Sequence, residues 1–136
     1  MGGTQQFRRS PDILVVEDSA LDREMMRRVL AKHPAGHEFL FVDTVARARE
    51  TVAKCRVRMI FLDNTLPDGH GANLAVELND AAAHRNIPVI LVSDWPSPFM
   101  YAKAKSPNVR EIWRKEEFDL DNVSRVIGEQ MRPGLC

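Results

Sequence analysis

The 136-residue sequence contains few cysteines, no excess of either charge and no long apolar run. Two cysteines, Cys55 and Cys136, fit neither a disulfide framework nor a metal site, so we expect the protein to reside in a reducing cytoplasm. Basic and acidic residues are equal at 19 each, a balance that gives no indication of binding to nucleic acid or to a membrane surface. No apolar stretch approaches the length of a membrane span.

The two ends of the chain lack the features of structured elements. The start, MGGTQQFRRSP, has no apolar signal core, and Gln6 stands where a myristoylation signal needs Ser or Thr. We therefore expect a flexible tail over residues 1–11, one domain over 12–131 and a short tail over 132–136. An apolar content of 44% and a charged content of 28% are typical of a globular domain with one core.

Short apolar runs alternate with segments of helical periodicity along this domain. Strands are expected at residues 13–16, 39–42, 59–63, 87–92 and 109–113. Helices are expected from Ser19 to Pro34, at 44–54, 71–84 and 99–105, and from 119 or 121 onward. In the first helix we expect Leu21 to face inward and Asp22 to face water while completing a box-like N-terminus with Ser19. The alternation predicts a parallel sheet with helices on both faces, a doubly wound α/β fold.

One aspartate stands at the end of the third predicted strand. Asp63 closes the apolar run Met59–Leu62 and precedes a stretch rich in turn formers, Asn64–Gly69. A continuous apolar run predicts a strand that is buried on both faces. Open α/β sheets bind their ligands at the carboxyl ends of such strands, and a carboxylate buried there without a partner would be costly. Asp63 is therefore the first candidate functional residue.

Polar side chains follow three further strands and are expected to converge on Asp63. Glu17 and Asp18 follow the first strand, Ser93 ends the fourth, and Lys115 follows the fifth. Three clustered carboxylates repel one another unless a cation binds, and hard oxygen ligands suit Mg²⁺. The lysine and the hydroxyl would complete a site for an anion. A phosphoryl group attached to an aspartate is chemically consistent with this set.

This constellation resembles the receiver domain of two-component response regulators. The resemblance covers nearly all of residues 12–131 and rests on ILVVEDS, FLDNTLPDGHG, VILVS and Lys115. The separations of 30 residues from Asp63 to Ser93 and 22 from Ser93 to Lys115 are typical of that family. Pro67 and Gly71 also stand where the family has these residue types. The resemblance implies a flavodoxin-like (βα)5 fold with strand order 2-1-3-4-5.

The resemblance also implies a set of roles. Asp63 would accept a phosphoryl group from a phosphohistidine on a sensor histidine kinase or a phosphotransfer protein. Lys115 and Ser93 would bind the phosphoryl oxygens. Magnesium would be held by Glu17, Asp18, Asp63 and the backbone carbonyl of Thr65. Movement of Ser93 would bias a surface made of the fourth helix, fifth strand and fifth helix, where a downstream protein would bind. We expect a stand-alone cytoplasmic signalling protein that is not an enzyme, with no nucleic-acid or membrane partner.

Four positions depart from the family pattern. Asp94 follows the switch serine, where a small residue is usual, and its carboxylate could repel the phosphoryl group or pair with Lys115. Trp95 stands at a position that, with Thr65, tunes the lifetime of the phosphoryl group. Ile112 replaces an aromatic that usually couples to the switch, and Glu116 replaces a proline. Asp94, Ile112 and Glu116 support one alternative, an interaction domain that keeps the fold but does not depend on phosphorylation.

Another alternative is a haloacid-dehalogenase-like phosphatase. The string LDNTLPDG is similar to the DxDxT signature of that class, but Phe61 stands where the nucleophilic aspartate would be. Two further observations stay open at this point. Five of the nine aromatic residues lie between 95 and 118, where they either fill the core or form a partner surface. The four histidines show no ligand spacing and are expected to be exposed.

Overall fold

The computed structural model describes residues 11–34 and 36–131, so the predicted tails, apart from Pro11, lie outside the described residues. Five parallel strands form one sheet in the order β2-β1-β3-β6-β7. These strands are β1 (Ile13–Val16), β2 (Phe39–Val42), β3 (Met59–Asp63), β6 (Val89–Ser93) and β7 (Val109–Arg114). Counted along the chain, this is the order 2-1-3-4-5, which confirms the predicted doubly wound, flavodoxin-like fold.

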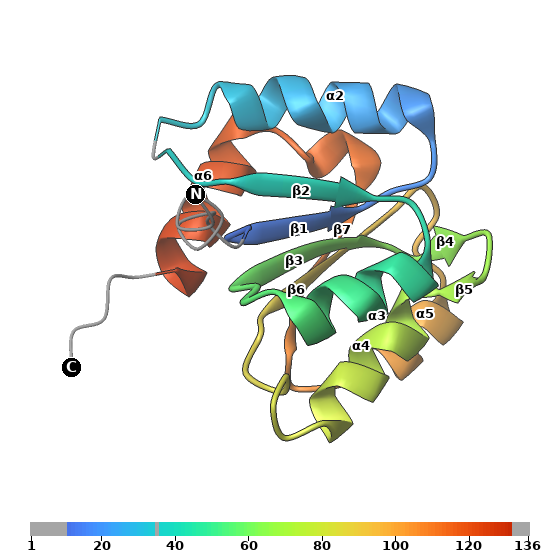
Figure 1. Ribbon diagram of the computed structural model, residues 1–136. Coiled ribbons are helices and arrows are strands. Elements are labelled where there is room, and N and C mark those ends of the chain that lie inside the picture. Colours follow the sequence, from blue (N-terminus) through green and yellow to red (C-terminus); the bar gives the residue numbers. More distant parts are fainter. Residues whose placement is uncertain (1–10, 35, 132–136) are drawn as a thin grey trace, which may run out of the picture.

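Helices cover both faces of the sheet (Figure 1). One face carries α2 (Ala20–Ala31) and α6 (Leu120–Gln130), and the other carries α3 (Val45–Lys54), α4 (Gly71–Asp80) and α5 (Pro98–Lys103). Alternate residues of the central strands therefore enter two separate cores. Leu14 and Leu62 pack toward α3 and α4, whereas Val15 and Phe61 pack toward α2 and α6. Among the described helices, none has both the length and the apolar character that a membrane crossing requires.

Polar side chains define where most of the helices begin. Ser19, Thr44, Ser97 and Asp119 each accept a hydrogen bond from the backbone N–H three residues further on, which satisfies one free donor of the first turn. Thr44 is thus the cap of α3 and not its first residue. Pro98 occupies the first turn of α5, where its missing N–H costs nothing, so this helix begins one residue earlier than the periodicity predicts.

Some local predictions were wrong. The helix expected over 71–84 ends at Asp80, because no side chain beyond Leu78 in that segment is fully buried to support another turn. Leu21 was expected to face inward but is 80% exposed, since it lies in the first turn of α2. A short antiparallel hairpin was not predicted; it pairs β4 (Thr65–Leu66) with β5 (Gly69–His70) directly after Asp63.

Gly71 fixes how closely α4 approaches the end of β3. A Cβ atom at this position would overlap the backbone carbonyl oxygen of Asp63 and lie 2.9 Å from Leu62 Cγ. The N–H groups of Gly71 and Ala72 donate to the backbone and side-chain oxygens of Asn64, each at 2.9 Å, and hold the intervening loop closed. The glycine therefore permits the tight path that places Asp63.

Gly71→Ala is expected to lower the free energy of unfolding by about 1–3 kcal/mol, because the clash is with backbone that cannot move aside cheaply. Gly128→Ala is the matched control, since a Cβ at this position in α6 meets no atom within 4 Å. The control should gain about 0.5–1 kcal/mol from the better helix propensity of alanine. Urea denaturation measures both, and a Gly71→Ala variant as stable as the control would contradict this role.

Candidate functional site

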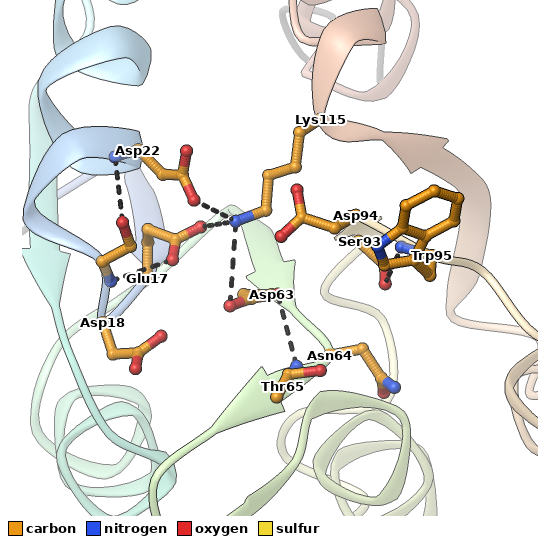
Figure 2. A pocket seen from close by; sticks show the side chains of 11 residues that line it. Glu17, Asp18, Asp22, Asp63, Asn64, Thr65, Ser93, Asp94, Trp95 and Lys115 are labelled. Atoms are coloured by element: carbon orange, nitrogen blue, oxygen red, sulfur yellow. Dashed lines mark hydrogen bonds and ion pairs between the residues drawn. The ribbon is translucent and has the colours of Figure 1, made fainter.

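The ends of β1, β3, β6 and β7 border one cavity of about 360 Å³ at the carboxyl edge of the sheet. Figure 2 shows the carboxylates of Glu17, Asp22 and Asp63 gathered around the ammonium of Lys115, whereas the side chains of Asn64 and Trp95 point away from it. The cavity is lined by Glu17, Asp18, Ser19, Asp22, Asp63, Asn64, Thr65, Ser93, Asp94, Trp95 and Lys115. The residues predicted from the sequence to meet at this edge therefore all border the same space.

Three carboxylates form a cluster within this cavity. Glu17, Asp18 and Asp63 each offer an oxygen, and these oxygens lie within 4.8 Å of one another. Glu17 is fully buried and Asp63 is only 5% exposed, whereas Asp18 faces solvent. The Thr65 N–H donates to Asp63 Oδ1 at 3.3 Å, which orients the carboxylate from the loop that follows it. The cluster is open on one side and has the oxygen donors that a hard divalent cation requires.

Lys115 supplies the positive charge of the site. It is the first residue of the short helix η1 (Lys115–Glu117) and is only 8% exposed. Its ammonium donates to Glu17 Oε1 at 2.6 Å and to Asp22 Oδ2 at 2.8 Å, while Asp63 Oδ2 lies farther away, at 3.9 Å. Burial alone would lower the pKa of Lys115, but the hydrogen bonds to Asp22 and Glu17 raise it above its ordinary value. The lysine is therefore charged throughout the physiological pH range.

Asp22 lines the cavity and was not among the site residues predicted from the sequence. It was expected to face water and to complete a capping box with Ser19. Its carboxylate instead turns into the cavity toward Lys115, and the Ser19 N–H donates to Glu17 Oε2 at 3.1 Å. The available signal was its place in the first turn of a helix that begins at the carboxyl edge of the sheet, four residues after Asp18.

The electrostatics of the cavity favour a bound cation. Burial, followed by repulsion from Glu17, raises the pKa of Asp63 to about 7, although Lys115 and the Thr65 N–H oppose this shift. An aspartate that holds its proton near neutral pH is one whose charge lacks sufficient compensation. A divalent cation among these carboxylates would supply the missing compensation.

Ser93 borders the cavity from the end of β6 and is buried. Its Oγ accepts a hydrogen bond from the Trp95 N–H at 3.3 Å. The hydroxyl thus faces the same space as Asp63 and Lys115, although no hydrogen bond joins Ser93 to either of them within the described residues. The predicted position of Ser93 at the cavity is thus confirmed. Its hydrogen bond is made to Trp95, in the loop that follows β6.

The residues that depart from the family pattern lie partly at the cavity and partly in the core. Asp94 is exposed and points into the cavity in Figure 2, but it does not pair with Lys115, whose hydrogen bonds go to Glu17 and Asp22. Trp95 lines the cavity and remains 87% exposed. Ile112 packs into the core beneath α4 and α5.

Glu116 stands in η1 and pairs with Arg114 at 3.3 Å. No cis peptide bond occurs in residues 11–34 and 36–131, so the bond between Lys115 and Glu116 is trans. Trp113 points to the opposite face from Ile112, as expected for neighbouring strand residues, and packs with Phe61 and Phe118 at centroid distances of 5.8 and 6.1 Å.

The clustered aromatics divide into buried and exposed residues. Trp113 and Phe118 fill the core, whereas Phe99 and Tyr101 are 82% and 50% exposed on α5. The expectation of exposed histidines holds for His70 but was wrong for His33, His37 and His84, which are half-buried. His33 stacks on His37 with ring centroids 5.6 Å apart. Burial, with a contribution from His37, lowers the pKa of His33.

The protein is therefore an α/β domain that has a cluster of three carboxylates and a buried lysine at the carboxyl edge of its sheet. The family model described as "Response regulator receiver domain" matches residues 13–126. The chain belongs to this family, which confirms the resemblance stated from the sequence. Receiver domains are signalling domains, and family membership decides against the phosphatase alternative, for which buried Phe61 would hold the place of the nucleophile.

Individual relatives agree with this assignment. The chain is similar to "Two-component response regulator ORR3" from Oryza sativa subsp. indica, with 34% identity over 89 residues. That match spans 65% of this chain and 66% of the rice protein, a little under two thirds of its length.

Two solved structures share the fold. A two-component response regulator from Legionella pneumophila superposes with a TM-score of 0.80 and 19% identity, over 90% of this chain and 99% of that one. The Mn²⁺-bound form of response regulator Rcp1 superposes with a TM-score of 0.74 and 19% identity, over 93% and 99%.

Proposed function

We propose that this chain is a phosphorylatable receiver whose Asp63 accepts a phosphoryl group from a phosphohistidine on a sensor histidine kinase or a phosphotransfer protein. The observation that carries the proposal is the convergence of three carboxylates, within 4.8 Å of one another, on a cavity that Ser93 and Lys115 also border. This set offers a nucleophile, ligands for a cation and two groups that bind phosphoryl oxygens.

The residues present fit Mg²⁺. The donor set is made of hard carboxylate oxygens, and burial together with repulsion from Glu17 raises the pKa of Asp63, a shift that an added positive charge would oppose. The ion would be held by Glu17, Asp18, Asp63 and the backbone carbonyl of Thr65. When bound, it would neutralise charge on the carboxylates and on the phosphoryl oxygens. Rcp1, which shares the fold, has been solved in a Mn²⁺-bound form.

Four residues of the chain would take part directly in the phosphoryl transfer. An oxygen of the Asp63 carboxylate attacks phosphorus, the new P–O bond forms, and the histidine leaves with the electron pair of the broken P–N bond. The Thr65 N–H holds Asp63 Oδ1 during the attack. Lys115, whose ammonium lies 3.9 Å from Asp63 Oδ2, is close enough to bind a phosphoryl oxygen after a small side-chain movement. Ser93 would donate its hydroxyl proton to another phosphoryl oxygen.

Incubation with acetyl phosphate and Mg²⁺ tests this function without the cognate kinase. Intact-mass spectrometry should show one added phosphoryl group, and none should be added when EDTA is present from the start of the incubation. Asp63→Asn should show no adduct. Asp68→Asn is the control, because Asp68 lies in the same loop but binds the N–H groups of Val45 and Ala46 at the start of α3. An undiminished adduct in Asp63→Asn would contradict the proposal.

The downstream surface belongs to the same proposal. It comprises α5, β7 and α6, where exposed Phe99 and Tyr101 offer the aromatic area that protein partners favour. We propose that the chain acts as a stand-alone cytoplasmic receiver over residues 12–131, without nucleic-acid or membrane partners. An immunoblot of the source cells tests the stand-alone part, since it requires a protein of about 15.4 kDa in the soluble fraction.

A second candidate is an interaction domain that does not depend on phosphorylation. The exposed carboxylate of Asp94 favours it, because it adds negative charge at the cavity that a phosphoryl group would enter. Beryllofluoride, which mimics an aspartyl phosphate, separates the two candidates. If a partner binds the protein equally well with and without the mimic, the second candidate is supported over a phosphorylation-driven switch.

A further inference from the structure

The acceptor aspartate is the most distant of the three carboxylates around Lys115. The ammonium donates to Glu17 at 2.6 Å and to Asp22 at 2.8 Å, and Asp63 stands at 3.9 Å, beyond hydrogen-bond reach. Figure 2 shows the ammonium between Asp22 and Glu17 on one side and Asp63 below it. Two of its three protons are thus already used by partners that do not accept the phosphoryl group.

Local structure holds Asp22 in this position. Its backbone N–H donates to Ser19 Oγ at 3.2 Å, which places Asp22 in the first turn of α2, where the helix dipole favours a negative charge. The side chain is 27% exposed and lies against the cavity wall. Since the Ser19 N–H is bonded to Glu17, nothing in the helix cap draws the Asp22 carboxylate back toward the backbone.

Negative charges outnumber positive charges in the cavity, so several carboxylates compete for the ammonium of Lys115. Five carboxylates line the cavity, those of Glu17, Asp18, Asp22, Asp63 and Asp94, and Lys115 is the one cationic side chain among its eleven described lining residues. A phosphoryl group would add about two negative charges. Glu17 belongs to the predicted cation ligands, so a bound Mg²⁺ would share its charge. Asp22 lies outside that ligand set and would keep its full attraction for the ammonium.

We propose that Asp22 is a positioning residue that holds Lys115 away from Asp63 and competes with the phosphoryl group for its ammonium. The proposal rests on the phosphoacceptor function proposed above and adds a control element to it. In the unphosphorylated protein, Lys115 bonds Asp22 and Glu17. In the phosphorylated protein, the ammonium moves toward the phosphoryl oxygens, so the bond to Asp22 weakens. Asp22 thereby lowers the affinity of the site for a phosphoryl group.

The test measures beryllofluoride binding at saturating Mg²⁺ through the intrinsic tryptophan fluorescence. Trp95, which lines the cavity, contributes to this signal together with buried Trp113. Asp22→Asn keeps the shape of the side chain and removes its charge. We expect this variant to bind the mimic on the order of threefold to tenfold more tightly, as the competing charged hydrogen bond weakens. Its affinity for Mg²⁺ alone should stay equal or fall, because a nearby negative charge is lost. A purely structural role would not separate the two affinities in this way.

Two further variants complete the test. Asp22→Glu restores the charge and should return the affinity for beryllofluoride toward the wild-type value. Asp121→Asn makes the same charge change in the first turn of α6, outside the cavity, and should leave both affinities unchanged. If Asp22→Asn folds poorly, Asp22→Ala takes its place, because it also removes the carboxylate that bonds Lys115. It should bind the mimic more tightly than the wild type does, and equal or weaker binding would overturn the competition.

The outcomes separate this proposal from the one on which it depends. If wild-type protein binds the mimic and Asp22→Asn binds it equally or more weakly, competition by Asp22 is overturned and the phosphoacceptor function stands. If wild-type protein binds no mimic and acquires no phosphoryl group, both proposals fall.

Discussion

In metal-free buffer at pH 8, Asp63→Asn is expected to unfold with a free energy about 2–4 kcal/mol greater than that of the wild type. The reason is the buried charge. Burial and Glu17 raise the pKa of Asp63 to about 7 in the folded protein, compared with 3.8 for an ordinary aspartate. Asparagine carries no charge, so it does not have this cost. Urea denaturation in the presence of EDTA measures the difference.

The dependence on pH follows from the sign of the shift. A carboxyl group whose folded pKa is raised binds its proton more tightly in the folded state. Its stabilising contribution is fully present below about pH 4 and is lost as the pH rises toward about 7. The advantage of Asp63→Asn should therefore shrink as the pH is lowered from 8 toward 4. Mg²⁺ should also reduce it, because the ion stabilises the wild type more.

Asp121→Asn is the control for this comparison, since Asp121 is exposed in the first turn of α6, away from the cavity. It should change stability by less than about 0.5 kcal/mol at every pH. If Asp63→Asn were no more stable than this control at pH 8, Asp63 would not be an uncompensated buried charge.

Lys115→Met is expected to lose about 3–5 kcal/mol of stability in the same buffer, the usual cost of removing one partner from a buried ion pair. Methionine fills most of the space but leaves the carboxylate of fully buried Glu17 without its partner at 2.6 Å. Asp22 loses its partner as well. Chemical denaturation at pH 8 measures the loss, which should decrease at low pH as the carboxylates take up protons.

Lys54→Met is the matched control. Lys54 also pairs with a carboxylate, that of Glu50 at 3.6 Å, but both side chains are mostly exposed. Such surface pairs contribute about 0–1 kcal/mol, so the control should stay close to the wild type. Combining Lys115→Met with Glu17→Gln should recover part of the stability, because the unpaired charge is gone. Equal losses for Lys115→Met and Lys54→Met would show that the buried network does not stabilise the fold.

The fold and the convergence of the site could be predicted because they depend on strong local patterns. Buried parallel strands appear as continuous apolar runs, and their carboxyl ends must meet at one edge of the sheet. Asp63, Ser93 and Lys115 stand directly at or after such ends, so their places follow from the topology. The end of each strand is marked by the local sequence, where an apolar run gives way to polar residues.

The partners of Lys115 could not be predicted in the same way. Asp22 has the sequence features of an ordinary capping residue, and only the packed structure brings its side chain to a lysine 93 residues further along. The same limit applies to Leu21, whose helical spacing fits the core although the first turn of α2 leaves it exposed. Periodicity identifies the side of a helix but not which turns lie over the sheet.

The most direct test of the central claim locates the phosphoryl group itself. After reaction with acetyl phosphate and Mg²⁺, borohydride reduces an aspartyl phosphate to homoserine, and peptide mass spectrometry identifies the converted residue. The account predicts homoserine at position 63 and at no other aspartate of the cavity. Conversion at Asp18, Asp22 or Asp94 with Asp63 intact would contradict it.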